Sequence, residues 1–176
     1  MITRLTQLAE FVKSSGRRYR IAIAWAQDSN SIGAVYKGVC EGFLEAALIG
    51  RKPEIIKVCE KENIDYSGLN IIESATDYEA CRKAVDMTRS GDADIVMKGL
   101  VGTDRFLKAV MDKESGLMEP GAILSYVCAI DVPAYKKLLF ITDPAVIPFP
   151  DLDQKIAMTR YAIDMARRFG ISKPRI

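Results

Sequence analysis

Residues 98–103, Lys-Gly-Leu-Val-Gly-Thr, hold the residue types best suited to binding an anion. They follow Ile95-Val96-Met97, an apolar run typical of a buried strand, and precede apolar positions at helical spacing. A glycine-rich turn between a strand and a helix directs free N–H groups toward the carboxyl edge of a parallel sheet, where open α/β proteins bind anions. Lys98 adds a positive charge. We therefore predict substrate contacts from Lys98, Gly99, Leu100, Val101, Gly102 and Thr103. The alternative is an ordinary strand–turn–helix junction in which Thr103 caps the helix.

Polar residues also follow two other apolar runs. Asp28-Ser29-Asn30-Ser31 comes after residues 21–26, and Asp143 comes after residues 137–142. Because parallel strands place their carboxyl ends together, we expect Ser29, residues 98–103 and Asp143 to meet at one cleft edge. The alternatives are helix capping by Asn30 or Ser31, and an Asp143 that satisfies the backbone donors of its turn. The chain has no histidine, so any acid–base chemistry must use other side chains or the substrate itself.

The composition excludes several classes of protein. The formal charge of +2 is too balanced for a nucleic-acid surface, and the longest apolar run is far shorter than the ~18 residues of a membrane span. The four cysteines form no C-x-x-C pair, which argues against a zinc site, and we expect no metal. They are best interpreted as reduced core residues, so a cytoplasmic location is expected.

Short apolar runs alternate with helical patterns through the first two thirds of the chain. The expected strands are residues 21–26, 47–49, 69–72 and 93–97, and the expected helices begin near residues 30, 53, 77 and 103. This alternation predicts an α/β fold with a mainly parallel, doubly wound sheet that is covered by helices on both faces. Thr76 and Glu79 form a capping-box pattern, and Gly91 is expected to end that helix.

The pattern changes in the last third of the chain. Residues 123–130 and 137–142 are separated by too few residues for a crossover, so an antiparallel pair is expected. Prolines then mark an extended segment before a helix that begins with the Asp151–Gln154 capping box. We predict a first α/β domain over 1–143, followed by a crossing segment and the first helix of an incomplete second domain over 144–176. Since 173–176 has the pattern of a strand start, we expect the chain to be the first half of a two-domain protein.

The sequence ADIVMKGLVGT, followed by FLKAVMDKESGL, resembles the phosphate acetyl/butyryltransferase family and is most similar to its butyryltransferase branch. Residues 123–127, 137–143 and 150–155 agree in order and spacing, and the similarity runs from about residue 20 onward. The resemblance implies an isocitrate/isopropylmalate dehydrogenase-like fold and the reaction of an acyl-CoA with phosphate to give an acyl phosphate and CoA. It also implies coenzyme A as a co-substrate without a tightly bound cofactor, and a dimer when the protein is full length.

The resemblance also bears on individual residues. The butyryl branch often has Ser-His where Ser125-Tyr126 stands here, so Ser125 joins Asp143 among the predicted substrate-binding residues while the histidine is replaced. The family's catalytic groups fall beyond Ile176, so no catalytic residue is assigned and the chain alone is expected to be inactive. The competing interpretation is a non-catalytic CoA- or acyl-phosphate-binding or interaction domain. An unrelated nucleotide-binding α/β domain is a third interpretation, but the Gly-x-Gly-x-x-Gly motif that would support it is missing after the first strand.

Overall fold

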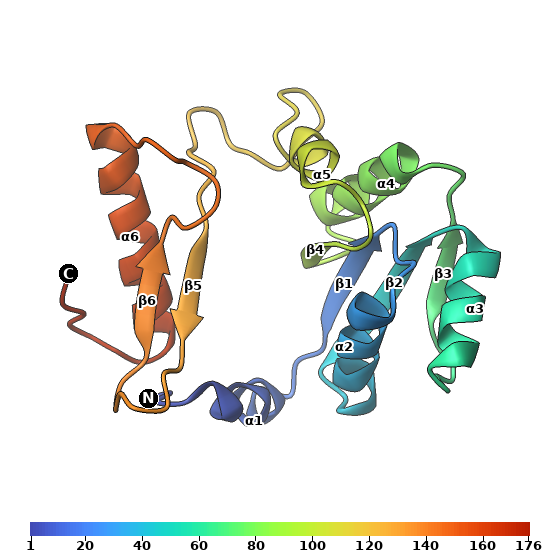
Figure 1. Cartoon of the computed structure of the whole chain (residues 1–176), viewed down its shortest axis with the longest axis horizontal. Coiled ribbons are helices and arrows are strands. Elements are labelled where there is room, and N and C mark those ends of the chain that lie inside the picture. The colour runs from blue at the N-terminus through green and yellow to red at the C-terminus, as the bar shows by residue number, and fades with distance from the viewer. The chain divides into compact units, whose positions relative to one another are not determined.

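The computed structural model describes residues 1–176 and divides them into two compact units (Figure 1). One unit is continuous and consists of residues 15–120, whereas the other combines residues 1–14 with residues 121–176. The domain division predicted at residue 143 stays a prediction. None of the helices has both the length and the apolar character that a membrane span requires.

The unit of residues 15–120 is a four-stranded parallel sheet in the order β3-β2-β1-β4. Its strands are β1 (Tyr19–Ala24), β2 (Leu44–Gly50), β3 (Asn70–Glu73) and β4 (Ile95–Lys98). Its helices are α2 (Ser29–Cys40), α3 (Lys52–Lys61), α4 (Asp77–Ser90) and α5 (Thr103–Val110). The predicted α/β class and parallel sheet are confirmed.

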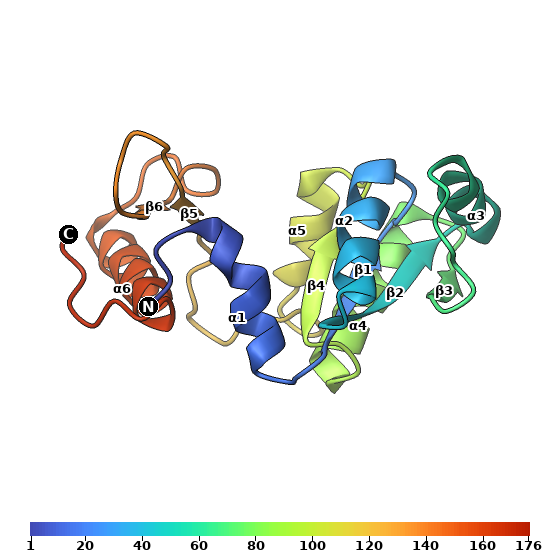
Figure 2. The ribbon, with the colours of Figure 1, turned by 90° about the horizontal axis from the view of Figure 1, so that it is seen from below.

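The alternating side chains of β1 separate two helical layers. Ile21 and Ile23 pack with the buried residues of α2 and α3, whereas Ala22 and Ala24 pack with those of α4 and α5. Figures 1 and 2 show α2 on one side of the sheet and α4 and α5 on the other. The small alanines on the second face leave room for α4, whose Ala80 and Ala84 are fully buried there. The sheet is therefore covered on both faces, as its short apolar strands predict.

The predicted start and end of α4 are confirmed. The Thr76 hydroxyl accepts a hydrogen bond from Glu79 N at 3.2 Å, and the Glu79 carboxylate accepts one from Ala75 N at 2.9 Å. Gly91 ends the helix with a φ of +83°, a conformation that glycine adopts without steric cost.

The predicted caps of two other helices are wrong. α2 begins one residue early, so Asp28 is its extended N-cap and accepts from Ser31 N at 2.8 Å, while Asn30 lies within the first turn. At α5 the N-cap is Gly102, because Thr103 is already helical and makes no capping bond. Sequence pattern alone could not distinguish capping positions that lie one to three residues apart.

The unit of residues 1–14 and 121–176 contains the predicted antiparallel pair. β5 (Val127–Ile130) pairs with β6 (Leu139–Thr142), and α6 (Leu152–Arg168) packs against both strands. α6 begins with the predicted Asp151–Gln154 capping box. The ring of Phe140 meets that of Phe169 edge to face, with centroids 5.2 Å apart. Residues 173–176, expected to begin a strand, form none here.

The N-terminal segment also belongs to this unit. A 3₁₀ turn, η1 (Leu5–Gln7), leads into α1 (Leu8–Ser14). Ile2 N donates to Phe169 O at 2.8 Å, and the Arg4 guanidinium contacts the Asp131 carboxylate at 2.6 Å. These bonds join the segment to α6 and to the end of β5.

Candidate functional site

The order of the sheet reverses at β1. β2 and β3 lie on one side of it, and β4, which comes later in the chain, lies on the other. In open α/β sheets ligands bind outside the carboxyl ends of the strands at such a switch point, because the following helices start on opposite faces. Residues 25–28 follow β1 and residues 99–102 follow β4. The loop predicted to bind substrate and the loop predicted to share its cleft edge therefore leave the sheet from two neighbouring strands, β4 and β1.

The two loops are bonded to each other through their backbones. Gly99 N donates to Ala24 O and Leu100 N donates to Trp25 O, both at 2.9 Å. A Cβ on residue 99 would lie only 2.5 Å from Trp25 O and 2.8 Å from Ala24 O, so only glycine fits there. Trp25 has a φ of +60°, a left-handed conformation that costs a non-glycine residue about 1–3 kcal/mol. The backbone is thus held in a costly conformation at the switch point.

The ammonium of Lys98 closes its own loop. Its Nζ donates to Gly99 O at 3.3 Å and to Val101 O at 3.1 Å. An ammonium has three N–H donors, so one remains for an anion. Lys98 therefore stabilises the loop and also supplies a positive charge at its surface.

The other predicted residues of the loop differ in what they expose. Val101 is only 5% exposed and anchors the loop in the core under α4 and α5, whereas the Leu100 side chain is 60% exposed. At the start of α5, the Asp104 carboxylate lies 2.6 Å from the position where a Cβ on Gly102 would stand. This carboxylate already interacts favourably with the helix dipole, so an incoming anion must compete with it.

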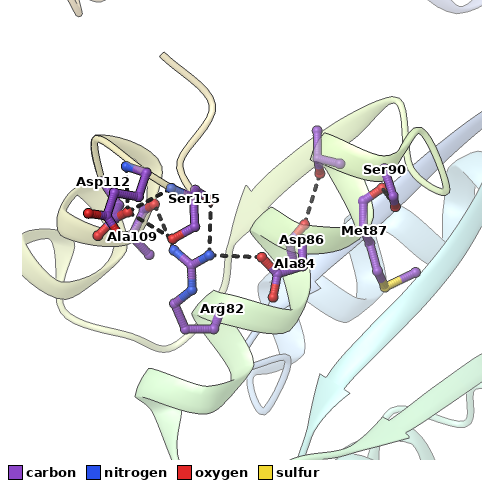
Figure 3. A network of polar contacts seen from close by, with 10 residues as sticks. Arg82, Ala84, Asp86, Met87, Ser90, Ala109, Asp112 and Ser115 are labelled. Atoms are coloured by element: carbon purple, nitrogen blue, oxygen red, sulfur yellow. Dashed lines mark hydrogen bonds and ion pairs between the residues drawn. The ribbon is translucent and has the colours of Figure 1, made fainter. Parts of the chain in front are cut away.

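Arg82 of α4 holds the end of α5 in place (Figure 3). Its guanidinium donates to Ala109 O at 3.3 Å and to Ser115 O at 2.9 Å, and it pairs with Asp86 at 2.8 Å. The Asp112 carboxylate closes the turn after α5 by accepting from Ser115 N at 2.8 Å. Because one side chain binds a carbonyl of the last turn of α5 and a carbonyl of the turn after it, the helix that follows the loop is fixed to α4.

The loop after β1 contains Asp28, which the sequence interpretation named, and Gln27, which it missed. Gln27 Nε2 and Asp28 Oδ2 are buried atoms without a hydrogen-bond partner, and Gln27 Nε2 lies 3.2 Å from the Cβ position of Gly50. The place of Gln27 directly after a buried strand was the available signal for it. Ser29, by contrast, donates to the Glu62 carboxylate at 2.8 Å, beyond the end of α3.

The structure brings Ser125 and Asp143 together in the other unit. The Asp143 carboxylate accepts from Ser125 Oγ at 2.9 Å and from the N–H groups of Tyr126, Ala145 and Val146 at 3.1, 2.9 and 2.7 Å. Burial alone would raise the pKa of Asp143, but these hydrogen bonds outweigh it and hold the pKa at about 2. The carboxylate thus satisfies the donors of its turn. The expected meeting of Asp143 with Ser29 and residues 98–103 stays a prediction.

The arrangement at the switch point suits binding and orientation of an anion. Residues 98–103 offer backbone N–H groups and one ammonium, and they contain no carboxylate, thiol or imidazole that could serve as a base. No group of three or more histidine, cysteine, aspartate or glutamate side chains is arranged to hold a metal ion.

Comparison with known proteins gives consistent results. The family described as "Phosphate acetyl/butaryl transferase" matches residues 77–176. The phosphate butyryltransferase of Clostridium beijerinckii is 36% identical over 157 residues, which are 89% of this chain and 52% of that protein. That of Clostridium acetobutylicum is 34% identical over 176 residues, 100% of this chain and 58% of that protein. The chain spans about half the length of these curated relatives.

Solved structures share the fold. A branched-chain phosphotransacylase from Enterococcus faecalis V583 superposes with a TM-score of 0.72 at 21% identity, covering 89% of this chain and 54% of that one. A phosphotransacetylase from Streptococcus pyogenes superposes with a TM-score of 0.78 at 14% identity, covering 95% of this chain and 60% of that one. At these identities the likeness supports the fold alone.

Proposed function

This chain belongs to the phosphate acetyl/butaryl transferase family, and from that premise we propose that it takes part in phosphate-dependent acyl transfer. The reaction joins a phosphate oxygen to the acyl carbonyl carbon of an acyl-CoA and breaks the carbon–sulfur bond. The products are an acyl phosphate and CoA, whose thiolate takes up a proton. A short acyl chain of the butyryl type is proposed because both Clostridium relatives at 34–36% identity are named phosphate butyryltransferases.

Within this reaction the proposed role of residues 98–103 is recognition of the phosphate group of a substrate. The supporting observation is the position of this loop at the β1/β4 switch point, where Lys98 keeps one N–H donor beside exposed backbone. An anion held there would be oriented by fixed dipoles, because Gly99 locks the loop to β1. Coenzyme A is the proposed co-substrate, and no catalytic residue is assigned within the 176 residues.

A non-catalytic CoA- or acyl-phosphate-binding domain is the second candidate. It is favoured because the predicted polar groups already make hydrogen bonds to other groups of the protein. The Asp143 carboxylate accepts four hydrogen bonds, and Lys98 Nζ donates to two carbonyls of its own loop. None of these groups is free to remove a proton from a thiol, so binding without turnover would be the result.

Calorimetric titration of the chain with coenzyme A and with butyryl phosphate tests the recognition site. We expect Lys98→Ala to weaken binding about 5–150-fold, which corresponds to the 1–3 kcal/mol of a charged hydrogen bond. Lys108→Ala, which removes the same charge from the last turn of α5, is the matched control and should change the affinity less than twofold. Equal affinities of the Lys98→Ala variant and the wild type would place the ligand elsewhere.

A turnover assay then separates the two candidates. The purified chain is incubated with butyryl-CoA and phosphate, and released CoA is detected by thiol titration. Turnover would support the acyltransferase and place essential groups within these residues. Binding that depends on Lys98 without turnover would support the binding domain.

A further inference from the structure

The first turn of α5 has backbone N–H groups without an acceptor. Gly102 is the N-cap and supplies no side chain, and the first helical bond runs from Phe106 N to Gly102 O at 3.1 Å. The N–H groups without an acceptor belong to Thr103, Asp104 and Arg105. Lys98 Nζ donates to Val101 O, directly before the cap. The start of the helix therefore presents several donors close to one positive charge.

A carboxylate lies next to these donors. Asp104 is exposed, and its Oδ1 lies 2.6 Å from the position where a Cβ on Gly102 would stand, whereas its Cγ lies 3.8 Å from that position. The carboxylate is thus turned back over Gly102, the last residue of the loop. A side chain on residue 102 would occupy this space, so glycine leaves it to the Asp104 oxygen.

No group of the protein neutralises Asp104. Its carboxylate makes no ion pair and no hydrogen bond, and the guanidinium of its neighbour Arg105 is already held by both oxygens of Asp77, at 2.6 and 2.8 Å. An ionised carboxylate has acceptor sites only. The acceptor sites of Asp104 are therefore available to a ligand that brings a donor of its own.

Donors beside one unpaired acceptor complement a particular kind of anion. Any tetrahedral oxyanion can accept hydrogen bonds from the free N–H groups and from Lys98. Inorganic phosphate near neutral pH keeps at least one P–O–H group, which can donate to a carboxylate in a charge-assisted hydrogen bond. Sulfate has the same shape but no O–H, so it would set a negatively charged oxygen against the carboxylate. Unfavourable contacts of this kind are a general source of specificity.

We propose that Asp104 is a specificity residue of this loop. Its carboxylate accepts the hydrogen of inorganic phosphate and excludes tetrahedral anions that carry no O–H, such as sulfate. The inference rests on the proposed role of residues 98–103 in phosphate recognition, and it adds the chemical form of the phosphate that is recognised. No proton is transferred in this contact, so Asp104 selects the ligand and has no assigned part in the chemical step.

Amide NMR of the nitrogen-15-labelled chain of 176 residues tests the proposal. Inorganic phosphate and sulfate are titrated separately at neutral pH and constant ionic strength, and the amide signals of residues 99–105 report both the affinity and the location of binding. We expect phosphate to shift these signals and to bind about 10–150-fold more tightly than sulfate, the factor that corresponds to one charged hydrogen bond.

Variants of Asp104 assign this preference to its carboxylate. Asp104→Asn replaces one acceptor oxygen by an amide donor, so sulfate should bind nearly as tightly as phosphate. Asp104→Ala removes the acceptor without adding a donor and should also lower the preference. Glu54→Gln, the matched control, removes the same charge from the first turn of α3 and should leave the preference unchanged. Circular dichroism melts verify that the three variants are folded.

The outcomes separate this inference from the proposed function. If both anions bind the wild-type loop equally, or if Asp104→Asn keeps the preference for phosphate, the role of Asp104 is overturned while phosphate recognition that depends on Lys98 stands. If phosphate shifts none of the signals of residues 99–105, or shifts them equally in Lys98→Ala, the recognition site fails and this inference fails with it. Sulfate binding gained in Asp104→Asn but not in Glu54→Gln would support the proposal.

Discussion

Replacing Gly99 by alanine should destabilise the unit of residues 15–120 by about 2–4 kcal/mol. The added Cβ would stand 2.5 Å from Trp25 O, about 0.9 Å closer than the 3.4 Å at which ordinary contact begins, and 2.8 Å from Ala24 O. Both neighbours are backbone atoms of the central strand or of the residue after it, so neither can rotate away. Overpacking of this kind costs about 1–3 kcal/mol.

The remainder of the cost comes from hydrogen bonds. Moving residue 99 outward lengthens the 2.9 Å bonds from Gly99 N to Ala24 O and from Leu100 N to Trp25 O. Each such bond contributes about 0.5–1.5 kcal/mol net. At a urea dependence of ~2 kcal/mol/M, the midpoint of unfolding should fall by about 1–2 M.

The assay is urea unfolding followed by tryptophan fluorescence. Trp25 is the only tryptophan of the chain and supplies one of the two carbonyls in the contact, so its emission reports on the affected unit. Gly33→Ala is the matched control, since a Cβ at that position in α2 meets nothing within 4 Å. It should stabilise the unit by about 0.5–1 kcal/mol, because alanine is the better helix former. An unchanged midpoint for Gly99→Ala, beside the expected rise for Gly33→Ala, would refute the argument from close approach.

Three further variants have expected outcomes. Because hydrogen bonds depress the pKa of Asp143 to about 2, its charge stabilises the fold above pH ~4 and this contribution is lost as the pH falls toward 2; Asp143→Asn should melt at a lower temperature than wild type at pH 7, and the gap should narrow in acid. Thr76→Ala removes the cap of α4 and should cost about 1 kcal/mol in urea unfolding. Arg82→Met should speed amide exchange in residues 110–117 several-fold, whereas Asp86→Ala should not; similar exchange in both would show that the carbonyl bonds of Arg82 are unimportant.

Much of the fold could be predicted from local pattern. The Thr76–Glu79 box and Gly91 predict both ends of α4 because capping depends on residues within one turn. The parallel sheet was predictable because each strand is a short apolar run followed by a helix. Thr103 was misassigned as a cap because a helix start depends on where the strand before it ends, which is set by pairing with β1.

The candidate site was predictable only in outline. The glycine at 99 marks a turn, but its strict requirement comes from Trp25 O, 74 residues earlier (99 − 25) in the chain. The bond between Ser125 and Asp143 joins residues 18 apart and depends on the β5–β6 register, which periodicity does not specify. Likewise, the two carbonyls that occupy Lys98 Nζ are fixed by the local turn geometry and not by residue type.

The division of the chain into one continuous and one discontinuous unit has a consequence for synthesis. Residues 15–120 can complete their sheet as soon as they emerge, since every strand partner is internal to them. Residues 1–14 emerge before them but acquire Asp131 and Phe169 as partners only after those later residues have been made. At 5–20 residues per second, the roughly 155 residues from Ser14 to Phe169 take about 10–30 s to translate. During that interval Ile2 and Arg4 lack the partners that hold the N-terminal segment in the folded unit, so this segment is the last part of its unit to be fixed in place.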